Sequence, residues 1–165
     1  MKKYGIFYGS ATGSTAAVAE AIAKELGVAK EDIKDVSEAS PSMFGDYETL
    51  ILGTSTWGDG EVQEDWYDML AGVQSLALEG KRIAIFGCGD ETMADTFCDG
   101  VGELYKRLLP TGATFIGDFD TEGYDYRHTS AEVDGKIVGL LLDQVNHSDL
   151  TEDRIHRWVE KIKNT

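Results

Sequence analysis

Residues 4–15 read YGIFYGSATGST, an apolar run followed directly by a loop of small and hydroxyl-bearing residues. The run from Tyr4 to Gly9 has the length and apolar character of a buried strand. Beyond the loop, Val18, Ile22 and Leu26 recur at helical spacing, which predicts one apolar helix face. A strand, a short loop and a helix in succession begin a β-α-β unit, so this stretch favours an α/β fold.

The same alternation of strand and helix continues to the end of the chain. Further strands are expected at Ile33 to Val36, Thr49 to Thr54, Arg82 to Gly87 and Ala113 to Gly117. Their near-continuous apolar character predicts a parallel sheet that is buried on both faces. We therefore predict a single domain over residues 1–165, a doubly wound sheet of five parallel strands. A ligand is expected at the carboxyl ends of the strands.

The segment from Asp118 to Lys136 interrupts this alternation. It is polar and acidic with scattered aromatic residues, and an apolar run resumes at Ile137 to Leu142. A structureless stretch of about twenty residues is uncommon inside a compact domain. We interpret it as a functional loop or an insertion, whose two apolar flanks are halves of one edge strand.

The 165 residues include 30 acidic and 15 basic side chains, for a formal net charge of −15. Such an excess repels phosphate backbones and anionic lipid surfaces, so neither nucleic acid nor a membrane is an expected partner. Basic-faced proteins are the expected partners. The two cysteines, Cys88 and Cys98, are too few for a disulfide framework and are expected as reduced thiols. We expect a cytoplasmic protein, because no signal peptide or membrane-spanning run is evident. We also expect it to be a monomer.

The loop after the first strand has the composition of a phosphate site. Backbone N–H groups and the positive end of a helix dipole converge there, among four hydroxyls. The loop contains no Lys or Arg, which argues against a triphosphate P-loop, and it lacks the dinucleotide fingerprint. A monophosphate ester fits best; alternatively, the hydroxyls only cap the helix. The residues concerned are Ser10, Ala11, Thr12, Gly13, Ser14 and Thr15.

Two further loops follow the third and fourth predicted strands and are expected at the same edge of the sheet. The first contains Ser55, Thr56, Trp57, Gly58, Asp59 and Gly60, and the second begins with Cys88, Gly89 and Asp90. A tryptophan in a glycine-rich loop favours stacking on a flat aromatic ligand, although it could instead tuck under its own loop. Together the two loops predict a slot beside the phosphate site.

These three loops, in this order, resemble those of the flavodoxin family. Residues 10–15 (SATGST) resemble the family's Ser/Thr-x-Thr-Gly-x-Thr, Thr56-Trp57 its stacking loop, and residues 88–90 its second flavin loop. The resemblance covers essentially the whole chain, and the segment from Asp118 to Lys136 resembles the long-chain type, whose fifth strand is interrupted. The resemblance implies the strand order 2-1-3-4-5, with FMN bound where the order reverses.

The resemblance implies an electron carrier of low potential rather than an enzyme, with FMN cycling between semiquinone and hydroquinone. The hydroxyls of Ser10, Thr12, Ser14 and Thr15 would hold the phosphate, Trp57 would stack on the ring, and Asp90 would accept a hydrogen bond from ring N3–H. Further contacts, mostly through the backbone, are implied for Ala11, Gly13, Ser55, Thr56, Gly58, Asp59, Gly60, Cys88, Gly89, Met93, Asp95, Phe97 and Cys98.

Two positions depart from the family pattern, and one is Val145, which stands where some long-chain relatives carry an acidic contact to the ribityl chain. Relatives place a tyrosine on the second ring face, where Met93 is the substitute here, since a thioether packs favourably on a ring; alternatively, Met93 fills a core gap. Two stretches of the chain are acidic: the one from Trp57 to Asp68 has five acidic residues and no basic residue, and so has the one from Asp90 to Glu103. These acidic runs are expected at the flavin edge, where they would disfavour a second electron and attract basic partners.

Three other classes of function remain as alternatives at this point. An FMN-dependent quinone or small-molecule reductase on the same fold would need groups for proton transfer. His128, His147 and His156 lie far from the flavin loops in sequence and are expected at the surface. A phosphoacceptor domain would need acidic residues at strand ends that carry Gly9-Ser10 and Thr54-Ser55 instead. A flavin-free binding module is the third alternative.

Overall fold

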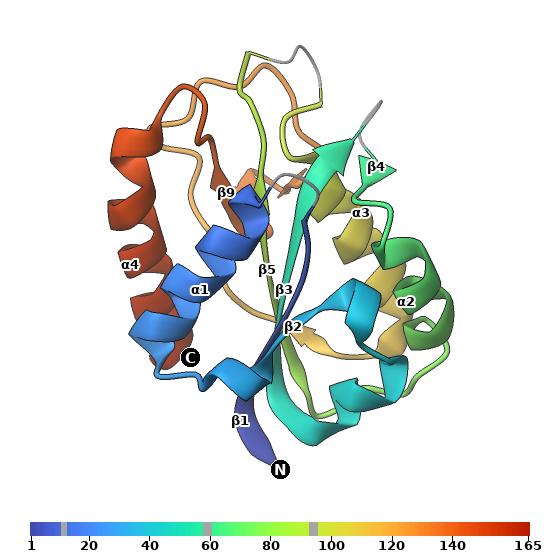
Figure 1. Cartoon of the computed structure of the whole chain (residues 1–165). Coiled ribbons are helices and arrows are strands. Elements are labelled where there is room, and N and C mark those ends of the chain that lie inside the picture. Colours follow the sequence, from blue (N-terminus) through green and yellow to red (C-terminus); the bar gives the residue numbers. More distant parts are fainter. Residues whose placement is uncertain (11–12, 58–60, 93–95) are drawn as a thin grey trace.

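The computed structural model shows a parallel sheet with helices α1 and α4 on one face and α2 and α3 on the other (Figure 1). It describes residues 1–10, 13–57, 61–92 and 96–165, with Trp57 described by its backbone alone. The helices are α1 (Ser14–Leu26), α2 (Trp66–Val73), α3 (Asp99–Leu108) and α4 (Thr151–Lys163). Short 3-10 turns occupy Lys30–Asp32, Val36–Glu38, Pro41–Asp46, Leu109–Thr111 and Ser148–Leu150.

The strand order confirms the predicted fold class. The parallel strands β1 (Lys2–Gly9), β2 (Ile33–Asp35), β3 (Tyr47–Trp57), β5 (Arg82–Cys88) and β6 (Thr114–Phe115) are arranged in the order β2-β1-β3-β5-β6. Counting only these parallel strands along the chain, the order is 2-1-3-4-5. The order reverses between β1 and β3, which places the carboxyl ends of those two strands at the switch point.

The edge strand is divided in two, as predicted for the flanks of the insertion. Strand β6 pairs with the first two residues of β5, and β9 (Leu140–Leu142) pairs in the same parallel sense with its last three. The segment between them is more ordered than expected. It contains the antiparallel pair β7 (Glu132–Val133) and β8 (Lys136–Ile137), and Phe119 bridges to Ile137.

The central strands β1, β3 and β5 are buried on both faces of the sheet, as predicted, whereas β2 and β6 at the edges are only partly buried. Consecutive residues of β1, β3 and β5 are fully buried, including Ile6 and Phe7, Leu50 and Ile51, and Ile85 and Phe86. Strand β3 runs three residues beyond its expected end at Thr54, because β4 (Glu61–Val62) folds back and pairs with Thr56 and Trp57. No helix among the described residues is long and apolar enough to span a bilayer.

Candidate functional site

Three loops meet at the carboxyl edge of the sheet, as the sequence predicts. The register pairs Gly9 of β1 with Thr54 of β3, and it pairs Ser55 of β3 with Cys88 of β5. The loops that follow these residues therefore begin side by side, although they are up to 79 positions apart in the sequence. The candidate site is built from these three strand ends and from the N-termini of α1 and α3.

The first loop gives α1 a polar N-terminus. Ser10 Oγ accepts a hydrogen bond from the Gly13 N–H at 3.0 Å, and Gly13 takes the left-handed conformation at φ 91°. Thr15, in the first turn of the helix, is 1% exposed, and its Oγ1 has no hydrogen-bond partner among the described residues. Ser14 is exposed at the helix start. The predicted ligands Ala11 and Thr12 lie outside the described residues.

The second loop follows three polar residues near the end of β3, Thr54, Ser55 and Thr56. Ser55 Oγ is buried and, like that of Thr15, has no hydrogen-bond partner in the described part of the chain. Thr56 Oγ1 accepts a hydrogen bond from Gly100 N–H at 3.0 Å, which ties this loop to the first turn of α3. Residues Gly58, Asp59 and Gly60, and the side chain of Trp57, fall outside what the structure describes. The stacking role of Trp57 stays a prediction.

The two orphaned hydroxyls identify where a ligand would be held. A buried polar atom without a partner costs roughly 1–3 kcal/mol, and an unsatisfied atom in a native fold calls for an explanation. Thr15 Oγ1 is at the N-terminus of α1, and Ser55 Oγ is at the end of the neighbouring strand. A phosphate ester would satisfy the first with its oxygens, aided by the free N–H groups and the dipole of the helix.

The third loop, residues 89–92 after β5, is called here the β5 loop. Its first residue, Gly89, donates its N–H to Leu142 O of β9 at 2.9 Å. A Cβ on Gly89 would lie 3.0 Å from both the backbone N and Sγ of Cys98, so the close packing excludes a larger side chain. Burial raises the pKa of Cys88 to about 12 and that of Cys98 well above its ordinary value. Both thiols are free and protonated at neutral pH, as predicted.

Asp90 is held rigidly in the β5 loop. Its Oδ1 accepts hydrogen bonds from the N–H and the hydroxyl of Thr92 and from Asn146 Nδ2. Those bonds, led by that of the Thr92 hydroxyl, lower the pKa of Asp90. The carboxylate is therefore charged, and Oδ2 retains acceptor capacity for a ring N–H.

Two predicted contacts, Phe97 and Cys98, have their side chains in the core. Phe97 is 1% exposed and stacks on Tyr126, with 5.6 Å between ring centroids. Cys98 is fully buried and has a left-handed backbone at φ 50°, directly before α3. Both side chains are buried, and an aromatic ring of the insertion covers that of Phe97. Only the backbone groups of the two residues can therefore reach a ligand. Met93 and Asp95, also predicted as contacts, lie outside the described residues.

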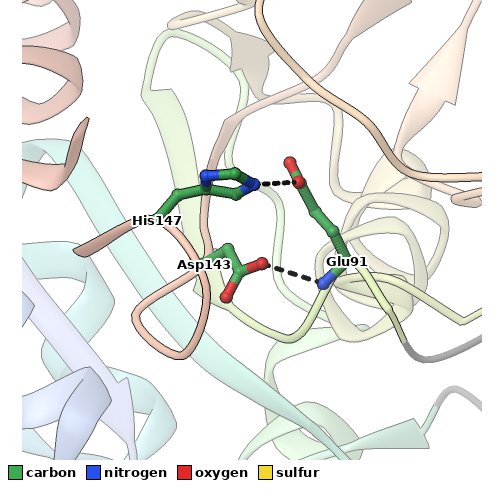
Figure 2. Close-up of side chains that lie close together, drawn as sticks. All are labelled: Glu91, Asp143 and His147. Carbon is green, nitrogen blue, oxygen red and sulfur yellow. Dashed lines mark hydrogen bonds and ion pairs between the residues drawn. The ribbon is translucent and has the colours of Figure 1, made fainter. Parts of the chain in front are cut away.

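His147 is partly exposed, with 35% of its side chain accessible, and it also contacts the β5 loop, which the sequence did not predict. Its Nε2 lies 3.0 Å from Glu91 Oε2, and the Glu91 side chain is 3% exposed (Figure 2). Asp143 Oδ2 accepts the Glu91 N–H at 3.1 Å. His156 lies elsewhere, on α4, where its Nδ1 is 2.8 Å from Glu25 Oε1 of α1. Nothing in the sequence around His147 indicates a partner more than fifty positions away.

Among the described residues, Glu91, Asp143 and His147 are the three potential metal ligands that lie together. One ligand atom from each lies within 4.8 Å of the others. Within this group, His147 Nε2 and Glu91 Oε2 are 3.0 Å apart. Asp143 also has both oxygens engaged, since they accept four hydrogen bonds from Glu91, Val145 and Asn146. The three side chains are therefore a hydrogen-bonded and ionic cluster rather than a coordination shell.

The two acidic runs differ in the structure. In the first, Glu61, Glu64 and Asp68 are exposed around the start of α2. In the second, Glu91 is buried and Glu103 pairs with Arg107 at 2.8 Å. Among the described residues, the second run therefore has two carboxylates engaged within the protein, and the first has three that are exposed.

Comparison with known proteins gives one consistent result. The family model described as Flavodoxin matches residues 6–158. A flavodoxin of Nostoc is 42% identical over 163 residues, covering 98% of this chain and 96% of its own. Flavodoxin 1 of Shigella flexneri is 39% identical, with coverages of 98% and 93%. The crystal structure of Fusobacterium nucleatum flavodoxin bound to flavin mononucleotide superposes with a TM-score of 0.89 at 32% identity, covering 99% of this chain and 98% of that one.

Proposed function

The chain belongs to the flavodoxin family, whose members are electron-transfer proteins rather than enzymes, and we propose that it carries single electrons on FMN bound at the carboxyl edge of its sheet. The observation that carries the assignment of the site is the pair of orphaned hydroxyls, Thr15 Oγ1 and Ser55 Oγ, beside the N-terminus of α1. When bound, FMN supplies the redox chemistry by accepting and donating electrons one at a time.

One set of residues binds the phosphate of FMN, and another set binds its ring. The hydroxyls of Ser10, Ser14 and Thr15, with the free N–H groups of α1, bind the phosphate without a basic side chain. Backbone groups at Gly89 and Asp90 meet the polar edge of the ring. The buried thiols of Cys88 and Cys98 lie beneath that loop and exclude water from its inner side.

The expected ligands that the structure does not describe complete this proposal. Ala11 and Thr12 would belong to the phosphate loop, and Trp57 would cover one ring face. The other residues assigned to the ring and ribityl chain are Gly58, Asp59, Gly60, Met93 and Asp95.

The orphaned hydroxyl of Thr15 gives a direct test of the phosphate site. Thr15→Val has nearly the same shape but no hydroxyl, so it removes a group that FMN phosphate would satisfy. We expect FMN to bind about tenfold more weakly, which corresponds to about 1.4 kcal/mol. The apoprotein should keep or gain stability, because it loses an unsatisfied buried hydroxyl. Flavin fluorescence on dilution and urea unfolding measure the two effects.

Thr111→Val is the matched control. Thr111 lies just beyond the C-terminal end of α3 and is also 1% exposed, but its Oγ1 donates a hydrogen bond to Leu108 O, in the last residue of that helix. This change should lower stability by about 1 kcal/mol and leave FMN affinity unchanged. Unaltered affinity in Thr15→Val would contradict a phosphate site at α1.

We also propose that the exposed carboxylates around the start of α2 attract redox partners with a basic face. Glu64 and Asp68 are exposed there, and neither forms an ion pair with any described side chain. Reversing both charges with Glu64→Lys and Asp68→Lys should slow electron transfer to a basic haem protein about tenfold at low salt. The difference should shrink as salt screens the field.

A double variant at the opposite edge of the sheet controls for net charge. Asp46→Lys with Glu48→Lys makes the same change in charge at exposed residues beside the start of β3. Its rate should stay within about twofold of the parent protein, since the added charge is more than a Debye length from the flavin edge. Equal slowing by the two pairs would show that net charge, not this surface, sets the rate.

A further inference from the structure

The Glu91–His147 contact joins the β5 loop to the segment that follows β9 (Figure 2). The His147 side chain is 35% exposed and can exchange protons with water, whereas that of Glu91 is 3% exposed. Histidine is the side chain that changes charge between about pH 5 and 8. One partner of this contact is therefore a buried carboxyl group, and the other is an imidazole that is accessible to water.

The carboxylate of Glu91 depends on its partner. Neither of its oxygens has a hydrogen-bond donor of good geometry among the described residues, although His147 Nε2 is within ion-pair distance. A buried carboxylate without donors or a countercharge is strongly destabilised. Protonated His147 supplies the countercharge, and neutral His147 does not.

The carboxyl and phenol groups around the contact do not supply a positive charge to Glu91. Asp90 and Asp143 lie beside it on the two segments it joins, and both carboxyl groups have lowered pKa values, so they stay charged. Tyr124 and Tyr126 of the insertion also interact with Glu91, and burial raises the pKa of each phenol, so both stay neutral. Arg154 of α4 faces the insertion, where its guanidinium lies 3.9 Å from the Tyr124 ring centroid and Nη2 donates to Gly123 O, while its buried Nη1 has no hydrogen-bond partner among the described residues.

We propose that Glu91 and His147 form a proton-dependent clamp that positions the β5 loop for FMN. The inference rests on the proposed function. Protonated His147 holds Glu91, and with it Asp90 and Gly89, in the arrangement that meets the flavin ring. When His147 loses its proton, the buried Glu91 carboxylate is left without that countercharge, and the loop keeps only the bonds that do not involve the Glu91 side chain, namely Gly89 N–H to Leu142 O, Glu91 N–H to Asp143 and Asn146 to Asp90. FMN is thus bound more tightly in mildly acidic than in mildly alkaline solution.

The test compares FMN release from the diluted holoprotein at pH 6 and pH 8.5, at constant ionic strength, by flavin fluorescence. The phosphate of FMN itself titrates near pH 6, so the informative quantity is the difference between parent and variant. From pH 6 to 8.5 the dissociation constant of the parent should rise about tenfold more than that of His147→Gln. Glu91→Gln, which removes the buried charge, should flatten the profile equally.

His156→Gln is the matched control, because His156 pairs with Glu25 at 2.8 Å but lies away from the β5 loop. This variant should keep the full pH dependence of the parent. Identical profiles in parent and His147→Gln would overturn the clamp, as would a Glu91→Gln variant that keeps the slope. A slope abolished by a chelator would assign the effect to a metal instead. Failure of the parent to retain FMN at either pH would overturn the proposed function itself.

Discussion

Gly139→Ala should destabilise the protein by about 3 kcal/mol or more, because the sheet has no room for a side chain at this position. A Cβ on Gly139 would lie 2.1 Å from the carbonyl oxygen of Ile85 and 2.9 Å from its carbonyl carbon. Both atoms are backbone in the middle of β5, so neither can rotate away. The new methyl group would force β9 off β5 just before the pairing of Leu140 with Phe86.

Thermal and urea unfolding measure this effect. For a chain of this size, 3 kcal/mol corresponds to a fall in Tm of about 6–12 °C. The hydrogen bond from Gly89 N–H to Leu142 O should weaken as well, since Leu142 is part of β9 and would move with it. The proposed site would then lose the support of its third loop, and FMN should be released more readily.

Gly45→Ala is the control for the loss of a glycine as such. Gly45 is exposed, and a Cβ there would meet no atom within 4 Å. Its stability should remain within about 0.5 kcal/mol of the parent. A small effect of Gly139→Ala would mean that β5 and β9 can separate without cost, which would contradict the description of the edge strand as one interrupted strand.

The parts of the fold that sequence predicts correctly are those set by local pattern. The apolar run of β1, the loop of small residues and the apolar face of α1 are all contiguous in the chain, so hydrophobic periodicity identifies them. The interrupted edge strand follows from two apolar flanks around a polar segment. The strand order came from the family resemblance, because local pattern does not specify which strands are neighbours.

The features that sequence missed depend on contacts between distant segments. The stacking of Phe97 on Tyr126 joins the end of a flavin loop to the insertion, and no local pattern indicates it. The turn after β9 likewise brings the partly exposed His147 to Glu91, 56 positions earlier. β3 extends past Thr54 because β4 returns to pair with it, and a two-residue strand carries no periodic signal.

Asp143→Ala should produce the second large effect, because one buried carboxylate organises the turn after β9 and the β5 loop together. Asp143 is 1% exposed. Its oxygens accept hydrogen bonds from the backbone N–H groups of Glu91, Val145 and Asn146 and from the Asn146 side chain. Without the carboxylate, these donors lose their partner at once, and the β5 loop loses the hydrogen bond that Glu91 makes to Asp143.

We expect Asp143→Ala to lower the free energy of unfolding by about 2–3 kcal/mol, since the buried Glu91 N–H loses its partner at a cost of about 1–3 kcal/mol, whereas the donors of the exposed residues Val145 and Asn146 can turn to water. Asp143→Asn keeps one acceptor oxygen and should lose about half as much. Asp149→Ala, at an exposed position in the following 3-10 turn, should be nearly neutral. Urea unfolding of the four proteins at pH 7 gives the comparison. A loss below 1 kcal/mol in Asp143→Ala would contradict the organising role.

The pH dependence separates this effect from the proposed clamp. Burial alone would raise the pKa of Asp143, but the hydrogen bonds from Asn146, Glu91 and Val145 outweigh it and lower the pKa. Its contribution to stability is therefore present above the ordinary value of about 3.9 and is lost as the pH falls through the lowered pKa. The difference between the parent and Asp143→Asn should be constant from pH 5 to 8 and shrink below about pH 4. The clamp acts between pH 5 and 8, so a difference that changed there would assign the titrating group to His147 instead.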